Sequence, residues 1–163
     1  MAIHRFPIQL RFGDEDSNGH VNNVRYVQFL EEARVRLSLL PLPGDGTNSG
    51  PETFRSVTAE AGVTLVVRQE IEYRTPLTYR QELVWIEIWV SRVGESSLTY
   101  GFRLSDAETD TGTVFAVAEA AMVMVSRETG APLALSTRQR QILEDWRGGP
   151  VPFRRTAAAE AVN

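Results

Sequence analysis

One long segment with apolar residues at helical spacing, followed by four strand-like segments, restricts the folds open to this chain. Residues 23–40 carry apolar side chains at helical spacing, with charged residues on the opposite side. Four later segments are rich in β-branched and aromatic residues or alternate between apolar and polar ones, as strands do: 63–73, 83–90, 98–104 and 114–125. Turn-forming residues separate the last three, so the pattern predicts an antiparallel meander.

Shorter segments complete the layout. Residues 4–12 alternate and predict a first strand, whereas 41–51 are rich in proline and glycine and predict a loop. Residues 52–61 and 138–146 predict short helices. The order is therefore one strand, one long helix and four further strands. An antiparallel sheet can bury one face against that helix, which predicts an α+β fold.

The length of 163 residues is enough for one domain with its own core and too small for two. We expect this domain to occupy residues 1–146, and we expect residues 147–163 to form a flexible C-terminal tail. The strand segments 83–90 and 114–125 are apolar on both faces. One helix cannot cover both faces, so we expect self-association into a homodimer or homotetramer.

The composition excludes several classes of site. There is no cysteine and there are only two histidines, so one chain offers no thiol nucleophile, thiolate metal site or multi-histidine zinc site. The pattern G-x-S-x-G is absent. In residues 44–49, Ser49 stands where a dinucleotide-binding motif needs its third glycine. We therefore expect no metal and a chemistry that depends on carboxylates.

Charge and hydropathy limit the partners. A formal net charge of −4 argues against nucleic-acid binding, which needs a basic face. No apolar run approaches the roughly 20 residues that span a bilayer, so we expect no membrane segment. The N-terminus lacks the apolar core of a signal peptide, which makes a cytoplasmic location the expectation.

Residues 11–23, with the sequence R-F-G-D-E-D-S-N-G-H-V-N-N, give the strongest indication of a site. Three consecutive carboxylates, Asp14, Glu15 and Asp16, precede a glycine, a histidine and the start of the predicted long helix. A carboxylate beside the N–H donors of a helix N-terminus suits cleavage of an activated carbonyl. A plain strand-to-helix turn uses the same residue types, because they cap helices and lie near the positive end of the helix dipole.

A calcium loop is a further interpretation of this segment. Asp14, Asp16, Asn18 and Gly19 fit positions 1, 3, 5 and 6 of an EF-hand loop. Position 12 should be a bidentate glutamate, yet it is Arg25, and a strand-like segment precedes the loop where an EF-hand has a helix. Both differences count against calcium.

The order of motifs resembles the 4-hydroxybenzoyl-CoA thioesterase-like branch of the hotdog-fold acyl-CoA thioesterases. The matching stretches cover roughly residues 5–143 and follow one another in order: 11–26, 29–34, 70–77, 92–98, 118–127 and 129–132. The resemblance implies a hotdog fold, with one long central helix wrapped by an antiparallel sheet of about five strands. It also implies hydrolysis of an acyl-CoA thioester to a carboxylic acid and coenzyme A. Coenzyme A is then part of the substrate, and no separate cofactor is expected.

The resemblance implies that Asp16 carries the reaction. Asp16 either attacks the thioester carbonyl to form a mixed anhydride or acts as general base on a water. The implied oxyanion donor is the backbone N–H of Asn23, helped by Gly19 or His20, which agrees with the unpaired N–H groups of a helix N-terminus.

The neighbouring acids and the substrate-binding groups receive other roles. We expect Asp14 to orient the loop by hydrogen bonding to the backbone and Glu15 to be solvated. For the phosphates of coenzyme A and for the acyl group, the resemblance implies these residues: Arg92 with Ser96 and Ser97, then Arg127, and Tyr26 in the acyl pocket. The segment 41–62 is longer than is usual in the family, and we expect it to reshape that pocket.

Two other functions compete with the thioesterase. One is a hotdog enoyl-thioester hydratase or dehydratase, which needs a histidine paired with a carboxylate. The other is a non-catalytic acyl-CoA binding module, although the chain has no basic helix of the kind that a DNA-binding sensor carries.

Overall fold

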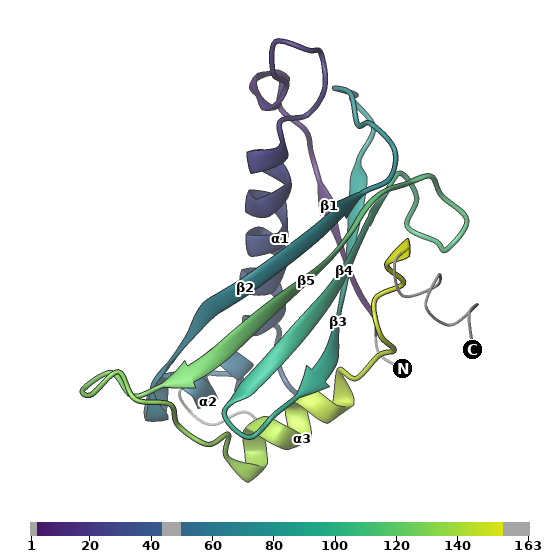
Figure 1. The fold of residues 1–163 in the computed structure, drawn as a ribbon. Coiled ribbons are helices and arrows are strands. Elements are labelled where there is room, and N and C mark those ends of the chain that lie inside the picture. Colours follow the sequence, from purple (N-terminus) through teal and green to yellow (C-terminus); the bar gives the residue numbers. More distant parts are fainter. Residues whose placement is uncertain (1–2, 44–49, 155–163) are drawn as a thin grey trace, which may run out of the picture.

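A five-stranded antiparallel sheet curves around one long helix (Figure 1). The computed structural model describes residues 3–43 and 50–154. Most of the predicted loop and the end of the predicted tail lie outside the described residues. The elements in chain order are β1 (His4–Ile8), the 3-10 turn η1 (Phe12–Asp14), α1 (Asn23–Ser38), α2 (Phe54–Ala61), β2 (Val63–Tyr73), β3 (Val84–Val93), β4 (Ser97–Ser105), β5 (Val114–Val125) and α3 (Thr137–Asp145). This arrangement confirms the predicted α+β fold.

The strands lie in the order β1-β3-β4-β5-β2, and every neighbouring pair is antiparallel. β3, β4 and β5 form the predicted meander. β2 crosses over and pairs with β5, so β1 and β2 are the two edges of the sheet. α1 runs along one face of the sheet, and α2 and α3 lie at the end where α1 terminates (Figure 1).

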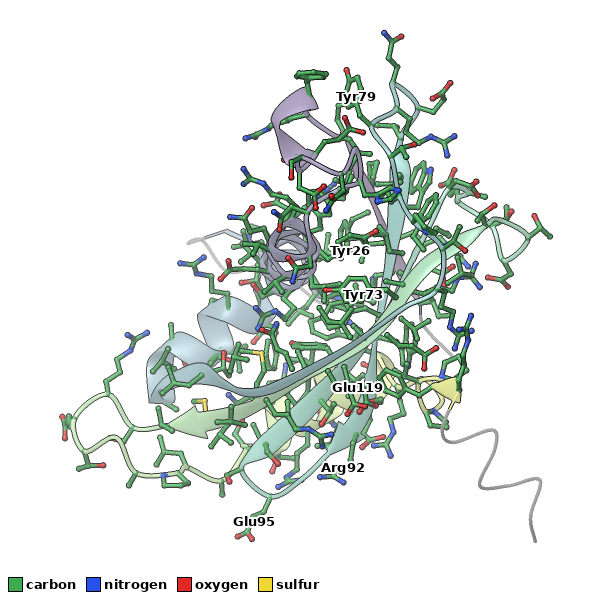
Figure 2. The ribbon with its side chains drawn as sticks, turned by 45° about the horizontal axis from the view of Figure 1, so that its top comes forward. Tyr26, Tyr73, Tyr79, Arg92, Glu95 and Glu119 are labelled. Carbon is green, nitrogen blue, oxygen red and sulfur yellow. The ribbon has the colours of Figure 1, made fainter. Side chains whose placement is uncertain are left out.

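α1 forms because its sequence supplies a cap and an apolar stripe. Asn22 precedes the helix with extended backbone, and its Oδ1 accepts a hydrogen bond from the Val24 N–H at 3.0 Å. The buried side chains of α1 are three or four residues apart: Tyr26, Leu30, Ala33 and Leu37. Figure 2 shows Tyr26 between α1 and the strands, close to Tyr73 of β2. The core therefore lies between this stripe and the inward face of the sheet.

Most boundaries agree with the sequence pattern. β2 and β5 have the predicted bounds, and α1 ends two residues before the predicted limit of residue 40. β3 extends to Val93 because it stays paired with Leu98 of β4 up to the turn. α2 and α3 begin where Thr53 and Ser136 cap their first turns with side-chain oxygens.

The first strand is shorter than predicted. The alternation suggested a strand up to Phe12, but β1 ends at Ile8, and Phe12 begins a 3-10 turn with 77% of its surface exposed. The cause is Asp14, whose Oδ2 accepts a hydrogen bond from the Arg11 N–H at 2.8 Å and turns the chain. A local side-chain bond to the backbone therefore overrides the alternating pattern.

The sequence predicted a flexible tail from residue 147 onward. Residues 147–154 instead pack against the rest of the chain. They lie against the face of the sheet that points away from α1. The Trp89 Nε1–H donates to the Gly149 carbonyl at 2.7 Å, and Val151 is buried beside Trp89 and Val117. The Arg154 N–H donates to Glu72 Oε2 at 2.8 Å. The chain therefore covers part of the apolar outer surface that was expected to need a second copy.

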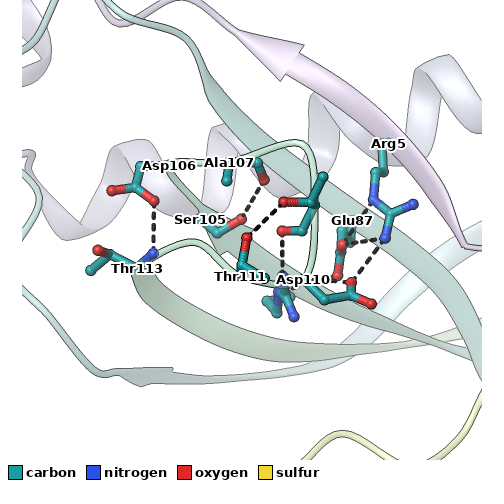
Figure 3. Close-up of polar contacts among 10 residues, drawn as sticks. Arg5, Glu87, Ser105, Asp106, Ala107, Asp110, Thr111 and Thr113 are labelled. Carbon is teal, nitrogen blue, oxygen red and sulfur yellow. Dashed lines mark hydrogen bonds and ion pairs between the residues drawn. The ribbon is translucent and has the colours of Figure 1, made fainter.

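A buried ion cluster occupies another part of this outer face (Figure 3). Glu87 lies between Ile86 and Ile88, which face α1, so its carboxylate points to the opposite side. It pairs with the Arg5 guanidinium at 2.9 Å and with Arg103 Nε at 3.2 Å. The strand segment 83–90 is therefore not apolar on both faces throughout, because its buried acid is neutralised by the flanking strands.

The β2 edge remains uncovered. Leu65 and Val67 are 51% and 61% exposed, and Tyr73 at the end of the strand is also exposed. The register with β5 shifts between Val66 and Arg68, which marks a β-bulge. An exposed edge strand with apolar side chains is a surface on which another strand can pair.

Candidate active site

The acidic loop between β1 and α1 is a tight, hydrogen-bonded hairpin. The Asp16 N–H donates to the His20 carbonyl at 2.8 Å, and the Gly19 N–H donates to the Asp16 carbonyl at 3.1 Å. Gly19 has φ +74°, a left-handed conformation that favours glycine. The Asn18 N–H also donates to Asp16 Oδ1 at 2.8 Å. The backbone and a side-chain bond thus fix the position of the Asp16 carboxylate.

Asp14 holds the base of this loop, as was predicted. The residue is only 6% exposed. Besides the bond from the Arg11 N–H, its Oδ1 lies 3.4 Å from Arg25 Nε in α1. Its carbonyl accepts a hydrogen bond from the Asn22 N–H at 2.8 Å. Asp14 therefore joins the start of the loop to the first turn of α1.

Glu15 is half-buried and hydrogen-bonded, whereas the sequence predicted a solvated side chain. Its Oε1 accepts a hydrogen bond from the Tyr79 N–H at 2.7 Å, in the connection between β2 and β3. The Val21 N–H donates to the Leu77 carbonyl of the same connection at 2.7 Å. These two bonds tie the loop to the end of the sheet. No local sequence signal could have shown this, because the partners are more than 55 residues away along the chain.

The start of α1 leaves one donor available. The Val24 N–H is bonded to Asn22 Oδ1 and to Asn23 Oδ1, both at 3.0 Å. The Asn23 N–H has no acceptor among residues 3–43 and 50–154. The Gly19 N–H is already engaged within the loop, and the His20 side chain is exposed. Of the predicted oxyanion groups, Asn23 is therefore the one at the helix N-terminus with its N–H unused.

Comparison with known proteins gives a consistent result. The model of the thioesterase-like superfamily matches residues 10–155. The chain belongs to this superfamily. No curated protein sequence matches it. Among solved structures, it is similar to a predicted thioesterase from Bacillus stearothermophilus, with 22% identity and a TM-score of 0.70 over 91% of this chain and 99% of that one.

Two other solved structures are similar as well. The YbaW probable thioesterase from Escherichia coli is 27% identical, with a TM-score of 0.70 over 87% of this chain and 97% of that one. A putative acyl-CoA thioesterase from Xanthomonas campestris is 28% identical, with a TM-score of 0.57 over 76% of this chain and 93% of that one. The protein is a thioester hydrolase, and its fold is the hotdog fold.

The predicted substrate-binding residues of this thioesterase do not surround Asp16 within one chain. The acidic loop contacts the connection between β2 and β3, whereas Ser96 lies in the turn at the far end of β3 and Ser97 begins β4 directly after it. The ten residues of β3 separate these two ends by about 30 Å. Figure 2 shows Tyr79 at one end of the molecule and Arg92 at the other. Tyr26 does lie near the acidic loop, one helical turn into α1.

Arg92 and Arg127 lie on opposite faces of the sheet. Arg92 lines a polar cleft of about 220 Å³ on the outer face, together with these residues: Arg68, Glu70, Ser91, Thr99, Glu119, Ala121 and Pro150. Arg127 follows β5 and lines a different cavity on the side of the helices. One chain therefore does not assemble Arg92 and Arg127 into a single phosphate site.

The Tyr26 side chain is buried in the core. Its ring meets that of Tyr73 edge to face, with centroids 5.0 Å apart at 88°. Burial raises the pKa of Tyr26 to about 12, so its hydroxyl stays protonated at neutral pH. It contributes to the hydrophobic core beneath the acidic loop.

A cavity that the sequence did not indicate lies between the C-terminal half of α1, α2 and the sheet. We call it the α1–α2 cavity. Its volume is about 330 Å³, and its lining comprises Glu31, Arg34, Val35, Ser38, Phe54, Arg55, Thr58, Ala59, Gly62, Val63, Thr64, Val66, Tyr100, Met122 and Arg127. Arg34 belongs to α1 and Tyr100 to β4. The sequence gives the position of each residue within its own element, but it does not show that the two residues line one cavity.

Within residues 3–43 and 50–154, no three histidine or acidic side chains gather in a way that could hold a metal ion. None of the helices in this described part is both long and apolar enough to cross a membrane.

Proposed function

We propose that this thioesterase hydrolyses acyl-CoA thioesters to a carboxylic acid and coenzyme A, with Asp16 as the catalytic carboxylate and the Asn23 N–H as oxyanion donor. The observation that carries the proposal is the acidic loop. It presents a partly exposed carboxylate, fixed by the Asn18 N–H, next to a helix N-terminus whose Asn23 N–H is unused. The similarity to the putative acyl-CoA thioesterase from Xanthomonas campestris supports the substrate class.

The chemistry follows from this arrangement. When Asp16 attacks the thioester carbonyl, or activates a water that does so, negative charge develops on the carbonyl oxygen. The Asn23 N–H and the positive end of the α1 dipole stabilise that charge. The C–S bond then breaks and coenzyme A leaves as its thiolate. In the nucleophilic route, water hydrolyses the resulting anhydride and regenerates Asp16.

We also propose that the active unit is a homodimer paired through β2. The exposed apolar side chains of β2 support this assembly. When the β2 strands of two copies pair antiparallel about a two-fold axis, the start of β2 in one copy lies beside the end of β2 in the other. The acidic loop of one copy then lies next to the Arg127 end of the other. This resolves the separation of about 30 Å within one chain, because the phosphate-binding residues would come from the partner.

Free-thiol release from a panel of acyl-CoAs tests the activity, with Asp16→Asn and Asp16→Ala beside the wild type. We expect losses of at least about 10²-fold in kcat, the range of a lost general base. Ser17→Ala, at an exposed position of the same loop, serves as the matched control and should keep wild-type rates. Full activity in Asp16→Ala would reject the assignment of Asp16.

The oxyanion donor can be tested without changing a charge. Asn23→Pro removes the backbone N–H at the first helical position, where proline is well tolerated, and Asn22 before it is already extended. We expect kcat to fall by about 10²–10³-fold with the helix intact. Asn23→Ala keeps the N–H and should stay close to wild type. Equal rates for the two variants would refute the role of this N–H.

A further inference from the structure

Arg34 lines the α1–α2 cavity and forms no ion pair with any of the residues 3–43 and 50–154. Its side chain is half-buried, and its Nε is buried with no hydrogen-bond acceptor among the described residues. Its one hydrogen bond goes from Nη1 to the Met122 sulfur at 3.3 Å, and sulfur is a weak acceptor. Burial lowers the pKa of Arg34, yet a guanidinium keeps its charge at neutral pH. The cavity thus contains a partly desolvated cation that forms no ion pair with any described residue.

The charge of the lining favours an anionic ligand. Arg34, Arg55 and Arg127 contribute three cations, and Glu31 is the one carboxylate among the residues that line the α1–α2 cavity. Glu31 is exposed and acts on Arg34 through space, without a hydrogen bond or ion pair among the described residues. This local excess of positive charge contrasts with the net charge of −4 and raises the local concentration of anions.

Tyr100 supplies a second kind of donor. Its ring is buried on β4 below α1, and its hydroxyl makes no hydrogen bond to any residue in the described part of the chain. Burial raises the pKa of Tyr100, so the hydroxyl remains a donor at neutral pH. A carboxylate at the floor of the cavity would meet both the fork of the Arg34 guanidinium and this hydroxyl.

The walls of the cavity indicate which part of a substrate fits. Phe54, Val63 and Val66 contribute apolar surface to the lining. Arg55 and Arg127 are exposed, so they lie at the rim rather than at the floor. Phosphates of coenzyme A keep much of their hydration and suit the rim, whereas an apolar chain that ends in a carboxylate matches apolar walls with Arg34 at the floor.

We propose that the α1–α2 cavity binds the distal carboxylate of the acyl group, so that the preferred substrates are thioesters of dicarboxylic acids. Arg34 is the counter-ion and Tyr100 an additional donor. This proposal rests on the proposed acyl-CoA hydrolysis and on the proposed dimer, which brings the acidic loop of the partner next to the Arg127 end of this chain and so beside the α1–α2 cavity. The thioester then lies at the partner's Asp16, because within one chain Arg34 is about 16 Å along α1 from Asn23, farther than a six-carbon acyl group reaches. The binding of the carboxylate itself is independent of turnover.

Binding is measured first, in the Asp16→Asn background, which prevents hydrolysis. The probes are adipyl-CoA, hexanoyl-CoA of the same chain length, and coenzyme A alone. We expect adipyl-CoA to bind at least about tenfold more tightly than hexanoyl-CoA, as for a hydrogen-bonded charged group. Arg34→Met should abolish the difference, and Arg34→Lys should keep part of it. Arg147→Met removes an exposed arginine that pairs with Glu144 elsewhere and should change nothing.

Three results would overturn the proposal. The first is equal affinity of the Asp16→Asn protein for adipyl-CoA and hexanoyl-CoA. The second is a loss in Arg34→Met that is the same for all three probes, since Arg34 would then bind the phosphates of coenzyme A. The third is a change of oligomeric state in Arg34→Met with the preference for adipyl-CoA unchanged, since its counter-ion would then belong to a partner subunit.

Turnover separates this proposal from the proposed function. The wild type should hydrolyse adipyl-CoA with a kcat/KM at least about tenfold above that for hexanoyl-CoA, and Arg34→Met should remove this ratio. If no acyl-CoA releases thiol, the proposed function fails, while the binding of adipyl-CoA still decides the role of Arg34. If both thioesters are cleaved equally and bound equally, the carboxylate site fails and the thioesterase stands.

Discussion

The first turn of α1 offers a stringent test, because two side chains serve one donor. Asn22 Oδ1 and Asn23 Oδ1 both lie 3.0 Å from the Val24 N. Losing an N-cap side chain typically costs about 1 kcal/mol of stability. Here Asn22→Ala leaves the second acceptor in place, so we expect a loss of no more than about 0.5 kcal/mol. Asn23→Ala should cost even less, because the cap itself remains.

The double variant should show the full cost. With both oxygens gone, the Val24 N–H has only water, and we expect a loss of about 1–1.5 kcal/mol, more than the sum of the single variants. Thr53→Ala in α2 is the reference, since Thr53 Oγ1 alone accepts the Ser56 N–H at 3.1 Å within the described structure. That single change should already cost about 1 kcal/mol.

The assay is denaturant unfolding followed by tryptophan fluorescence, at one protein concentration because an oligomer would make the midpoint concentration-dependent. Free energies of unfolding for the four members of the cycle give the coupling directly. If Asn22→Ala alone lost as much as the double variant, the shared donor would not exist in solution and the reasoning would be refuted.

Three further predictions concern other parts of the molecule. Gly101→Ala should lower stability by about 1–3 kcal/mol, since its Cβ would lie 2.5 Å from the Trp89 ring, and thermal unfolding measures this. Burial lowers the pKa of His4 below 6.5, so the unfolded chain takes up the proton first and stability falls as the pH drops below about 6.5. His4→Phe should flatten this dependence in melting curves recorded from about pH 5 to 7. Asp14→Asn should lower kcat/KM about tenfold or more by loosening the loop that positions Asp16, with a smaller effect on KM than on kcat. An unchanged kcat in Asp14→Asn would remove Asp14 from the positioning of the site.

Regular, local patterns in the sequence predicted much of the fold. The spacing of Tyr26, Leu30, Ala33 and Leu37 defines the buried stripe of α1 before any contact is known. The bounds of β2 and β5 follow from their apolar content. Failures occurred where a side chain bonds to the backbone. Asp14 ends the alternation early, and a pattern of hydrophobicity contains no information about such a bond.

The candidate site divides in the same way. The loop with Asp16 and the helix start with Asn23 are contiguous in sequence, so motif order was enough to propose them. The hydrogen bond from the Tyr79 N–H to Glu15 could not be predicted, because Tyr79 follows the end of a strand that is distant in the sequence. Arg34 was hidden for another reason, since an arginine on an amphipathic helix is ordinarily solvated. Its burial becomes apparent only when α2 and the sheet are in place.

The contact of residues 147–154 with the outer face has a consequence for how the molecule reaches its final state. Trp89 belongs to β3, yet its indole N–H finds its acceptor in Gly149, 60 residues later. During synthesis, the sheet can pair before this acceptor has left the ribosome, and until then Trp89 and Val117 remain exposed to solvent. We therefore expect residues 147–154 to dock after the strands of the sheet have paired. A shift in the fluorescence of Trp89 would report it in the refolding protein.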